Sequence, residues 1–374
     1  MIGILNCKLG DVIKFGNGKA RPSNEGATPI YGGNGILGYS ADANYAGETI
    51  VIGRVGAYCG ATYYEDHPIW VSDNALAAKP KDKNNAKYLF YFIKHFDLNQ
   101  HAQGSSHPLV TQTLLNSIDV EIVEDPNEQK AIAAVLSSLD DKIDLLHRQN
   151  KTLESMAASL FRQWFVEEAQ EDWEFVELGN YVSCFNGVSY KSDDLNPSTT
   201  AMVTLKSFER DGGFRLDGFK EFTGKYKEQH VVNQGDLVVA HTDITQDAAV
   251  IGNPVLVVPD PAYVKLVISM DLVKVTSKHE WLSNEFLYLL MRTREFKQHC
   301  LGHSNGSTVL HLSKTAIPTY DFLMPPKDKI NEFTKLAKGL LGKKFENISQ
   351  TMTLEKLRDT LLPKLMSGEI RVAF

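Results

Sequence analysis

The chain carries the same sequence pattern twice. Leu9-Gly10 precedes Asn17-Gly18, and the same two pairs recur, at an unchanged distance from each other, at Leu178-Gly179 and Asn186-Gly187. Further matches follow in the same order: Gly47–Val51 with Gly235–Val239, Tyr88–Lys94 with Phe286–Arg292, Gly104–Ser106 with Gly306–Thr308, and Thr152–Glu154 with Thr353–Glu355. Repeat proteins have periods of roughly 20 to 50 residues, and the spacing here is far longer. The sequence therefore predicts a duplicated domain, which can perform one task at two places.

Length and composition agree with two globular domains. At 374 residues the chain is long enough for two separate cores. The four cysteines lie far apart, without the paired spacing of a metal or redox site, so we expect reduced thiols and a cytoplasmic location. No apolar run is long enough to span a membrane. The formal net charge of −7 argues against a stand-alone nucleic-acid binder, because affinity for DNA depends largely on neutralised phosphates.

Each copy is predicted to be a mixed α/β domain that ends in a long helix. Short apolar runs bounded by Gly, Asp or Pro predict strands, as at Thr49–Ile52 and Leu237–Ala240. Ala86–His95 and Asn284–Met291 contain no helix breakers and predict helices packed on those strands. The expected fold class is α+β, with two tandem domains and two long helices in a pseudo-two-fold internal duplication. The expected boundaries are 1–126 and 169–325 for the domains, and 127–168 and 326–374 for the long helices.

The first long helix, Glu128–Phe165, has the sequence pattern of a coiled coil. Its apolar residues recur at alternating spacings of four and three without an intervening Pro or Gly, over roughly 60 Å at 1.5 Å per residue. The predicted seam consists of Ile132, Leu136, Leu139, Ile143, Leu146, Leu153, Leu160 and Trp164. Asn150 is the polar residue within this seam, and we expect it to fix the register of the pair.

The second long helix, Asp328–Leu365, is predicted to pair with the first in antiparallel orientation. Its seam residues are Phe333, Leu340, Leu354 and Leu361. Gly339 and Gly342 lower its helix propensity, and its middle apolar residues are out of frame with its end. Off the first seam, Phe161 and Phe165 have two interpretations: part of a domain core, or a docking patch for another subunit.

Several motifs match catalytic signatures by letter but not by context. Gly33–Gly38 spells a dinucleotide-binding fingerprint, but the segment that follows is too polar for the helix that this motif requires. Asp260 with Glu295 and Lys297 could be arranged as a nuclease site, although solvated surface charge is the simpler interpretation. The 11 histidines show no metal-ligand spacing. The sequence therefore predicts no catalytic centre and no metal site in this chain.

Polar, aromatic and basic residues gather in the loops at matching places of the two copies. The candidates in the first copy are Asn17, Lys19, Arg21, Tyr31, Asn34, Arg54, Tyr58, Asn74, Ser105, Ser106 and His107. The candidates in the second copy are Asn186, Tyr190, Lys191, Lys206, His241, Thr242, Asp243, His303, Ser304 and Asn305. Arg, Asn, Ser and Thr side chains read base edges and contact phosphates, so one interpretation is a DNA-contact surface in each copy. The other is a set of ordinary hydrophilic turns.

Taken together, these features resemble the specificity (S) subunits of type I restriction–modification enzymes over nearly the whole chain. The resemblance is carried by the paired Leu-Gly and Asn-Gly openings, Tyr31–Tyr39, the Gly-Ser segments at Gly104 and Gly306, and Glu128–Ile132 at the start of the long helix. The second helix departs from the pattern, because Lys329-Ile330 replaces the Glu-Gln pair of the first.

The resemblance implies a non-catalytic DNA-binding subunit. Each half would be a target-recognition domain that reads one part of a split, asymmetric DNA sequence, and the paired helices would set the distance between the two parts. Two adenine-N6 methyltransferase (M) subunits would dock on the chain, and ATP-driven restriction (R) subunits would join them. No cofactor is expected in this chain, whereas S-adenosylmethionine, Mg and ATP are expected on the partner subunits. The alternatives are a stand-alone DNA nuclease and an interaction protein that binds no DNA.

Overall fold

The computed structural model describes residues 3–102, 108–210, 212–245 and 247–372. The chain forms two compact units. Unit 1 comprises Met1–Leu146 and Ser349–Phe374, and unit 2 comprises His147–Ile348. Each unit therefore contains one α/β domain together with parts of both long helices.

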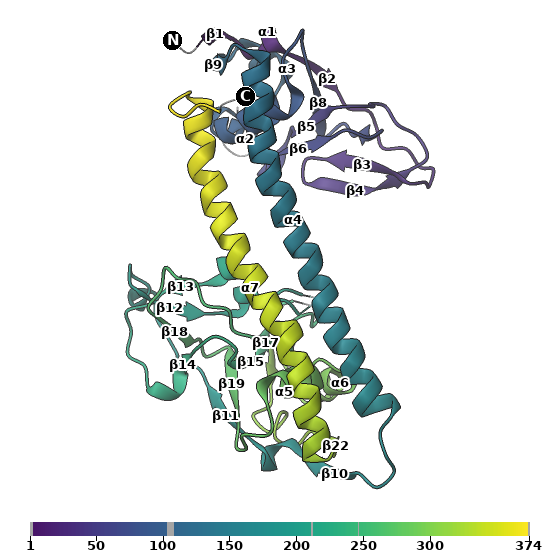
Figure 1. Cartoon of the computed structure of the whole chain (residues 1–374), viewed down its shortest axis with the longest axis vertical. Helices are drawn as coiled ribbons and strands as arrows, with labels where there is room; N and C mark the ends of the chain where they lie inside the picture. Colours follow the sequence, from purple (N-terminus) through teal and green to yellow (C-terminus); the bar gives the residue numbers. More distant parts are fainter. Residues whose placement is uncertain (1–2, 103–107, 211, 246, 373–374) are drawn as a thin grey trace. The chain divides into compact units, whose positions relative to one another are not determined.

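Unit 1 is built on a four-stranded antiparallel sheet that is covered by one helix (Figure 1). In spatial order the strands are β2 (Ile13–Asn17), β8 (Ala75–Pro80), β5 (Thr49–Gly53) and β6 (Thr62–Glu65). The central strand β5 is buried along its whole length, as expected for a run of β-branched residues. Helix α2 (Ala86–Phe96) packs on β5, β6 and β8. Its first turn is capped by the Asn85 side chain, which accepts a hydrogen bond from Tyr88 N.

Two smaller sheets complete unit 1. In the first, β3 (Thr28–Gly32) lies between antiparallel β4 (Gly35–Ser40) and parallel β7 (Trp70–Val71). The second pairs β1 (Ile4–Lys8) with β9 (Asp119–Val123). The short helices α1 (Leu9–Val12) and α3 (Gln112–Ser117) pack against each other. Strand β4 begins at Gly35 and includes Gly38, so Gly33–Gly38 does not lead into the helix that a dinucleotide site needs.

Unit 2 repeats this architecture in the same strand order, which confirms the internal duplication. Its main sheet consists of β11 (Val182–Asn186), β19 (Leu272–Ser277), β15 (Leu237–Ala240) and β17 (Pro254–Leu256), covered by α5 (Asn284–Met291). Its second sheet consists of β13 (Lys220–Glu221), β12 (Thr200–Val203), β18 (Lys265–Ile268) and β14 (Val231–Val232), and the β12–β18 pair is parallel like β3–β7. The two-stranded sheet is β10 (Glu174–Glu177) with β22 (Asp321–Met324). Unit 2 also has α6 (Arg294–Gly302) and a sheet of β16 (Thr242–Asp243), β21 (Leu310–Leu312) and β20 (Ser304–Asn305).

The duplicated Leu-Gly pairs hold the same place in the two units. Leu9 and Leu178 are both fully buried, and each donates its backbone N–H to the strand-end segment that precedes β9 or β22, at 2.8 and 2.9 Å. Both glycines sit against neighbouring chain: a Cβ on Gly10 would lie 2.4 Å from Asn116 Oδ1, and one on Gly179 would lie 2.9 Å from Pro318. The motif is therefore structural, because a side chain at either glycine would collide.

The two long helices include the segments that carry the coiled-coil pattern, and the second one ends before the expected boundary at 374. Helix α4 covers Pro126–Arg162 and continues in a π turn, Gln163–Glu167, and α7 covers Lys327–Met366. Within unit 1, Asp140 on α4 pairs with Arg358 on α7 at 2.8 Å. Within unit 2, Asn347 donates to Asn150 Oδ1 at 3.0 Å. Further along α4 in the same unit, Glu154 pairs with Lys344, which precedes Asn347 on α7, so the packing is antiparallel.

Burial along the helices distinguishes the two copies. On α4, Ile132, Leu136, Ile143, Leu146 and Asn150 are buried, and the remaining predicted seam residues Leu139, Leu153, Leu160 and Trp164 are half-buried. On α7, Phe333 is buried, whereas Leu340, Leu354 and Leu361 are half-buried. The deeply buried middle positions of α7 are Ala337, Leu341, Asn347 and Thr351, which the predicted seam omitted.

The Glu-Gln pair at the start of α4 also has a structural role. Glu128 is 2% exposed and receives two hydrogen bonds from Arg371. Gln129 donates to Val123 O and accepts from Asn85 N, both at 2.8 Å, and so fixes the residue that caps α2. In the second copy Ile330 is instead fully buried in the core.

Phe161 and Phe165 lie in the core of unit 2. Their side chains are 3% and 7% exposed and pack with Phe286 and Phe333 in the core of unit 2. Phe161 and Phe165 are four positions apart, so their rings lie on the same face of the helix. The rings also line a groove beside β22, and the next residue, Val166, is 51% exposed.

Candidate nucleic-acid interface

In unit 1 the candidate loops meet at one edge of the main sheet. Strands β2 and β5 end at this edge and β8 begins there, because Asn17 pairs with Leu76 and Gly53 with Ala75. The residue after β5, Arg54, donates its backbone N–H to Asn74 O at 3.0 Å. Asn17, Arg54 and Asn74 are thus brought together from three separate segments of the chain.

The parallel strands β3 and β7 end at the same edge and add two more loops. Lys19 forms an isolated bridge with Ser72, which directly follows β7. Gly33, before Asn34, lies close to the backbone oxygen of Asn74. A Cβ on Gly18 would lie 1.7 Å from Ser72 O, which explains why the Asn-Gly pair requires glycine.

Most of the predicted contact residues of unit 1 are accessible at this edge. Those with exposed side chains are Asn17, Lys19, Arg21, Asn34, Tyr58 and Asn74. Tyr31 is 6% exposed and donates its hydroxyl to Glu65. Burial and the neighbouring Glu65 carboxylate raise the pKa of Tyr31, so its ring is a core element rather than a free contact. Ser105, Ser106 and His107 lie outside the described residues.

Arg54 has an unusual environment at the centre of the edge. Its backbone is fixed on both sides, since its N–H donates to Asn74 O and its carbonyl accepts from Val110 N at 2.9 Å. The Arg54 Nε atom is buried and has no hydrogen-bond partner among the described residues. An unsatisfied buried donor is costly, so a shift of the Arg54 side chain that exposes this atom to an acceptor on a ligand would be favoured.

Unit 2 forms the same edge from equivalent strands. Asn186 pairs with Val273 and Ala240 with Leu272, which is the register seen for Asn17 and Gly53 in unit 1. His241 therefore occupies the position of Arg54, and its backbone N–H donates to Asp271 O at 2.8 Å. This equivalence follows from strand pairing, and it differs by one residue from the sequence match of Gly47–Val51 with Gly235–Val239.

His241, like Arg54, has a side-chain nitrogen whose hydrogen-bonding capacity is unsatisfied. Its side chain is 9% exposed, and its Nε2 atom is buried without a hydrogen-bond partner in the described part of the chain. Burial, with His311 and Lys314 nearby, lowers the pKa of the imidazole, which therefore stays neutral at neutral pH. A neutral imidazole nitrogen can donate or accept, depending on the tautomer.

A second equivalent pair of unsatisfied atoms lies beside the first. Ser72 and Ser269 are 1% and 0% exposed, and each Oγ is buried without a partner among the described residues. Each serine carbonyl accepts from the residue three positions later, at 3.0 and 2.9 Å, and each faces the glycine of an Asn-Gly pair. Sequence reasoning missed both serines. The signal was their shared place just before β8 and β19, which only the strand register makes visible.

The other candidates of unit 2 divide between this edge and its surroundings. His303, Ser304 and Asn305 lie near His241–Asp243 because β21 pairs with both β16 and β20. Asn186, Lys191, Lys206 and Asn305 are exposed. Tyr190 is half-buried, and its hydroxyl accepts from Lys220 Nζ at 3.1 Å.

Asp243 and Thr242, which the sequence suggested as DNA contacts, are buried residues with structural roles. Asp243 is 1% exposed, and its carboxylate accepts backbone hydrogen bonds from Thr245, Val250 and Ile251 at 2.7, 2.6 and 2.9 Å. Burial alone would raise the pKa of Asp243, but these hydrogen bonds outweigh it and lower the pKa. Thr242 is 5% exposed and donates to the Asp271 carboxylate. These side chains shape the loop instead of facing a ligand.

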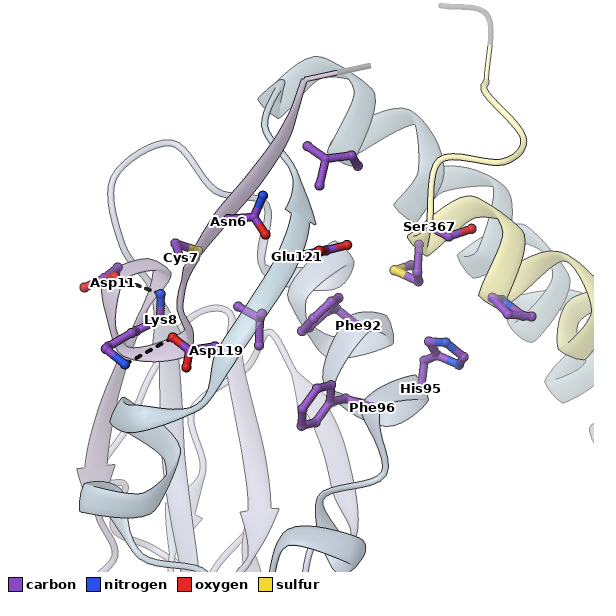
Figure 2. A pocket seen from close by; sticks show the side chains of 14 residues that line it. Asn6, Cys7, Lys8, Asp11, Phe92, His95, Phe96, Asp119, Glu121 and Ser367 are labelled. Atoms are coloured by element: carbon purple, nitrogen blue, oxygen red, sulfur yellow. Dashed lines mark hydrogen bonds and ion pairs between the residues drawn. The ribbon is translucent and has the colours of Figure 1, made fainter. Parts of the chain in front are cut away.

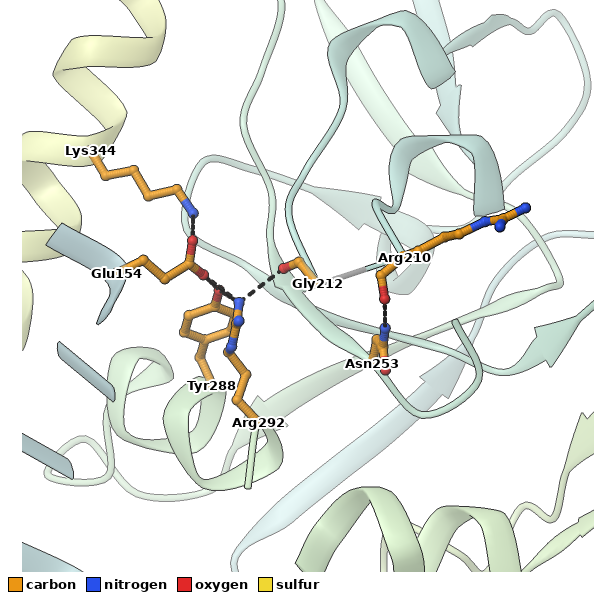
Figure 3. Close-up of polar contacts among 7 residues, drawn as sticks. All are labelled: Glu154, Arg210, Gly212, Asn253, Tyr288, Arg292 and Lys344. Atoms are coloured by element: carbon orange, nitrogen blue, oxygen red, sulfur yellow. Dashed lines mark hydrogen bonds and ion pairs between the residues drawn. The ribbon is translucent and has the colours of Figure 1, made fainter. Parts of the chain in front are cut away.

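A network of buried charges supports another loop of unit 2 (Figure 3). Glu154 on α4 binds Lys344 on α7, Tyr288 on α5 and Arg292, the residue that follows α5. Arg292 Nη1 donates further to Gly212 O at 3.0 Å. Burial acts to raise the pKa of Glu154, but Lys344 and Arg292 outweigh it and lower the pKa. The network joins three helices to the loop that carries Arg210.

The catalytic residues considered in the sequence can be placed in the structure. Among the described residues, no group of three or more His, Cys, Asp and Glu residues could hold a metal ion. Lys297 of the hypothetical nuclease set donates to Ile251 O at 2.6 Å and Asn253 Oδ1 at 2.8 Å, so it braces a loop. No helix in the described ranges could cross a membrane.

Comparison with known proteins identifies one family. Residues 3–155 match the model of the type I restriction modification DNA specificity domain. The chain is 25% identical over 318 residues to the type I restriction enzyme MjaIX specificity subunit of Methanocaldococcus jannaschii, covering 78% of this chain and 71% of that protein. It is 24% identical over 349 residues to the HindI specificity subunit of Haemophilus influenzae, covering 74% of each.

A solved structure shows the same fold. The crystal structure of the type I restriction–modification S subunit from M. genitalium superposes with a TM-score of 0.68 at 16% identity, covering 98% of this chain and 96% of that one. The duplicated domains, the long helix pair and the sequence relatives agree. Over residues 3–155 the chain matches the DNA specificity domain of type I restriction enzymes, and over most of its length it is similar to their specificity subunits, which supports a role in recognition of DNA sequence.

Proposed function

We propose that the chain reads a bipartite, asymmetric DNA target, with one half-site for each unit. It would also hold two adenine-N6 methyltransferase subunits, and restriction subunits would join that complex. In this proposal the chain itself performs no chemistry. S-adenosylmethionine, Mg and ATP are bound by the partner subunits.

The observation that carries the proposal is the equivalence of Arg54 and His241. Both follow the central strand of their sheet, both have a fixed backbone, and both carry a buried side-chain nitrogen without a partner among the described residues. Ser72 and Ser269 add a second pair at the same edges. A duplicated scaffold with different unsatisfied groups at one position suits two sites that read different bases, since base edges supply donors and acceptors.

The net charge of the chain is consistent with a complex in which the partner subunits contact the DNA phosphates and this chain contacts the bases. A chain with a net charge of −7 gains little from phosphate neutralisation on its own. Methyltransferase subunits that enclose the duplex would provide those contacts, and the two loop edges would provide base contacts. Phosphate contacts position a protein on DNA, whereas base contacts specify sequence.

The test is a genome-wide map of N6-methyladenine in cells that carry the gene, a deletion, or single variants. A split methylated motif that disappears on deletion supports the proposal. Arg54→Ala should alter one half-site, and His241→Asn should alter the other. Lys14→Ala, at an exposed position on β2 away from the edge, is the matched control and should leave the motif unchanged. An unchanged map on deletion, or one variant that alters both half-sites, contradicts the proposal.

A further inference from the structure

Each unit has a groove at its two-stranded sheet. In unit 1 the groove lies between the β1–β9 sheet, the end of α2 and the end of α7, with a volume of about 800 Å³ (Figure 2). Phe92 and Phe96 lie on α2, and Asp119 and Glu121 lie on β9. Ser367 directly follows α7. The side chains from these elements face a common space.

Unit 2 has a groove built from the corresponding elements. It lies between β10, β22, α5 and the end of α4, with a volume of about 280 Å³. Its rim includes Phe175, which is 71% exposed, and Val166, which is 51% exposed. Large apolar side chains exposed side by side on a protein surface indicate an interaction site.

The two grooves are copies of each other at the level of single positions. On the strands, Asp119 and Val120 correspond to Asp321 and Phe322, as fixed by the shared backbone bonds from Leu9 to Ile118 and from Leu178 to Tyr320. The helical equivalences follow from the matched segments of the duplication: Phe92 with Leu290, His95 with Thr293, Met366 with Phe165, and Ser367 with Val166.

The shared features define the chemistry of an occupant. The floor of both grooves is apolar, because Phe92 and Leu290 are each 6% exposed at its base. Both rims carry a carboxylate at the same position, Asp119 or Asp321, and both side chains are exposed. Lys8 pairs with Asp119 at 3.1 Å, but with side chains 53% and 87% exposed this pair is weak and exchangeable. An apolar anchor next to a lysine or arginine complements both grooves.

We propose that the two grooves dock two copies of one partner, one copy in each groove, through an apolar segment flanked by a basic residue. A surface that the chain presents twice suits two identical partners. Resting on the proposed function, the partner is the methyltransferase subunit. Each groove includes the end of one of the long helices, so one partner contacts the end of α7 and the other contacts the end of α4.

The test is native mass spectrometry of the full-length chain co-expressed with its methyltransferase subunit. The wild-type chain should carry two methyltransferase subunits. Asp119→Lys, at the rim of the first groove, should leave one, Asp321→Lys should leave one, and the double variant should leave none. Phe175→Asp tests the apolar contact of the second groove at a position too exposed to affect folding. The matched controls are Glu25→Lys in unit 1 and Glu228→Lys in unit 2, which are exposed and line neither groove.

The outcomes separate this inference from the proposed function. Two subunits on the wild-type chain and two on every groove variant overturn the groove assignment and leave the proposed function intact. If the groove variants instead remove a second copy of this chain from the complex, the grooves form a dimer interface, and this result also overturns the inference. A wild-type chain that carries no methyltransferase subunit overturns both proposals.

Discussion

Lys344 Nζ lies 2.6 Å from Glu154 Oε2, in an ion pair whose two side chains are each only 16% exposed. The other carboxylate oxygen of Glu154 binds Arg292 and Tyr288, so one acid satisfies two cations and a hydroxyl. Charges removed from water are stable only when they are paired and hydrogen-bonded. The Glu154 carboxylate therefore connects α4, α5 and α7 in unit 2.

Glu154→Gln should destabilise unit 2 by about 3 kcal/mol, because removal of one partner leaves buried cations uncompensated. The readout is urea denaturation followed by tryptophan fluorescence in a Trp70→Phe background, where the remaining tryptophans Trp164, Trp173 and Trp281 all belong to unit 2. The control is Glu346→Gln, since Glu346 pairs with Lys343 at the surface and should contribute less than about 1 kcal/mol. Equal effects of the two substitutions would show that the network is not a stabilising one.

The same network predicts a loss of stability in acid. Because the pKa of Glu154 is lower in the folded chain than in the unfolded chain, its contribution is complete above the unfolded value, about 4.3. It declines as the pH falls through the folded value. The difference in unfolding free energy between wild type and Glu154→Gln should therefore be largest near pH 7 and shrink below about pH 4. A difference that stays constant down to pH 3 would contradict the assignment.

Phe161→Ala should cost about 3 to 5 kcal/mol of unit 2 stability, since its ring is in contact with Phe286 and Phe333 in the core. Met156, on the same helix, is 49% exposed, so Met156→Ala should change stability by less than about 0.5 kcal/mol. The fluorescence assay above measures both. A stable Phe161→Ala chain that fails to assemble with its partner would instead restore the docking interpretation.

Gly18→Ala should disturb unit 1 and Gly187→Ala unit 2, each at its own recognition edge. The added Cβ would lie 1.7 Å from Ser72 O or 2.1 Å from Ser269 O, and the backbone must move, at a cost of about 3 kcal/mol. Each variant should weaken methylation at one half-site only, as measured in the methylation map. Gly339→Ala is the contrasting case: no atom lies within 4 Å of the added Cβ, so helix propensity should stabilise the chain by about 1 kcal/mol.

The sequence contains enough information for the architecture because the architecture is periodic and repeated. Heptad spacing predicts α4, and order-preserving matches predict two domains with one framework. In each matched Leu-Gly and Asn-Gly pair, a Cβ added to the glycine would collide with a neighbouring segment. Such a steric constraint keeps the glycine in both copies while the loops diverge.

The environment of individual loop side chains could not be predicted in the same way. Asp243 and Tyr31 belong to polar and aromatic segments that look like contact loops, yet both are buried. Whether such a residue faces inward depends on the register of strands distant in sequence. The equivalence of Arg54 and His241 is hidden for the same reason, since the two residues share no chemical type and are related only through the pairing of β5 with β8 and β15 with β19.

Insertion of one heptad into each long helix tests whether the helices set the distance between the half-sites. The insertions go between Leu146 and His147 on α4 and between Ile348 and Ser349 on α7, where the two units divide. One heptad adds about 10 Å of helix and restores the facing of the seam, so both units should keep their own half-sites. The unspecified spacer in the methylated motif should lengthen by about 3 base pairs at 3.4 Å per pair. A control insertion of four residues in α4 alone shifts the seam against its partner and should abolish assembly. A heptad variant that methylates the original motif would show that the spacer is set elsewhere.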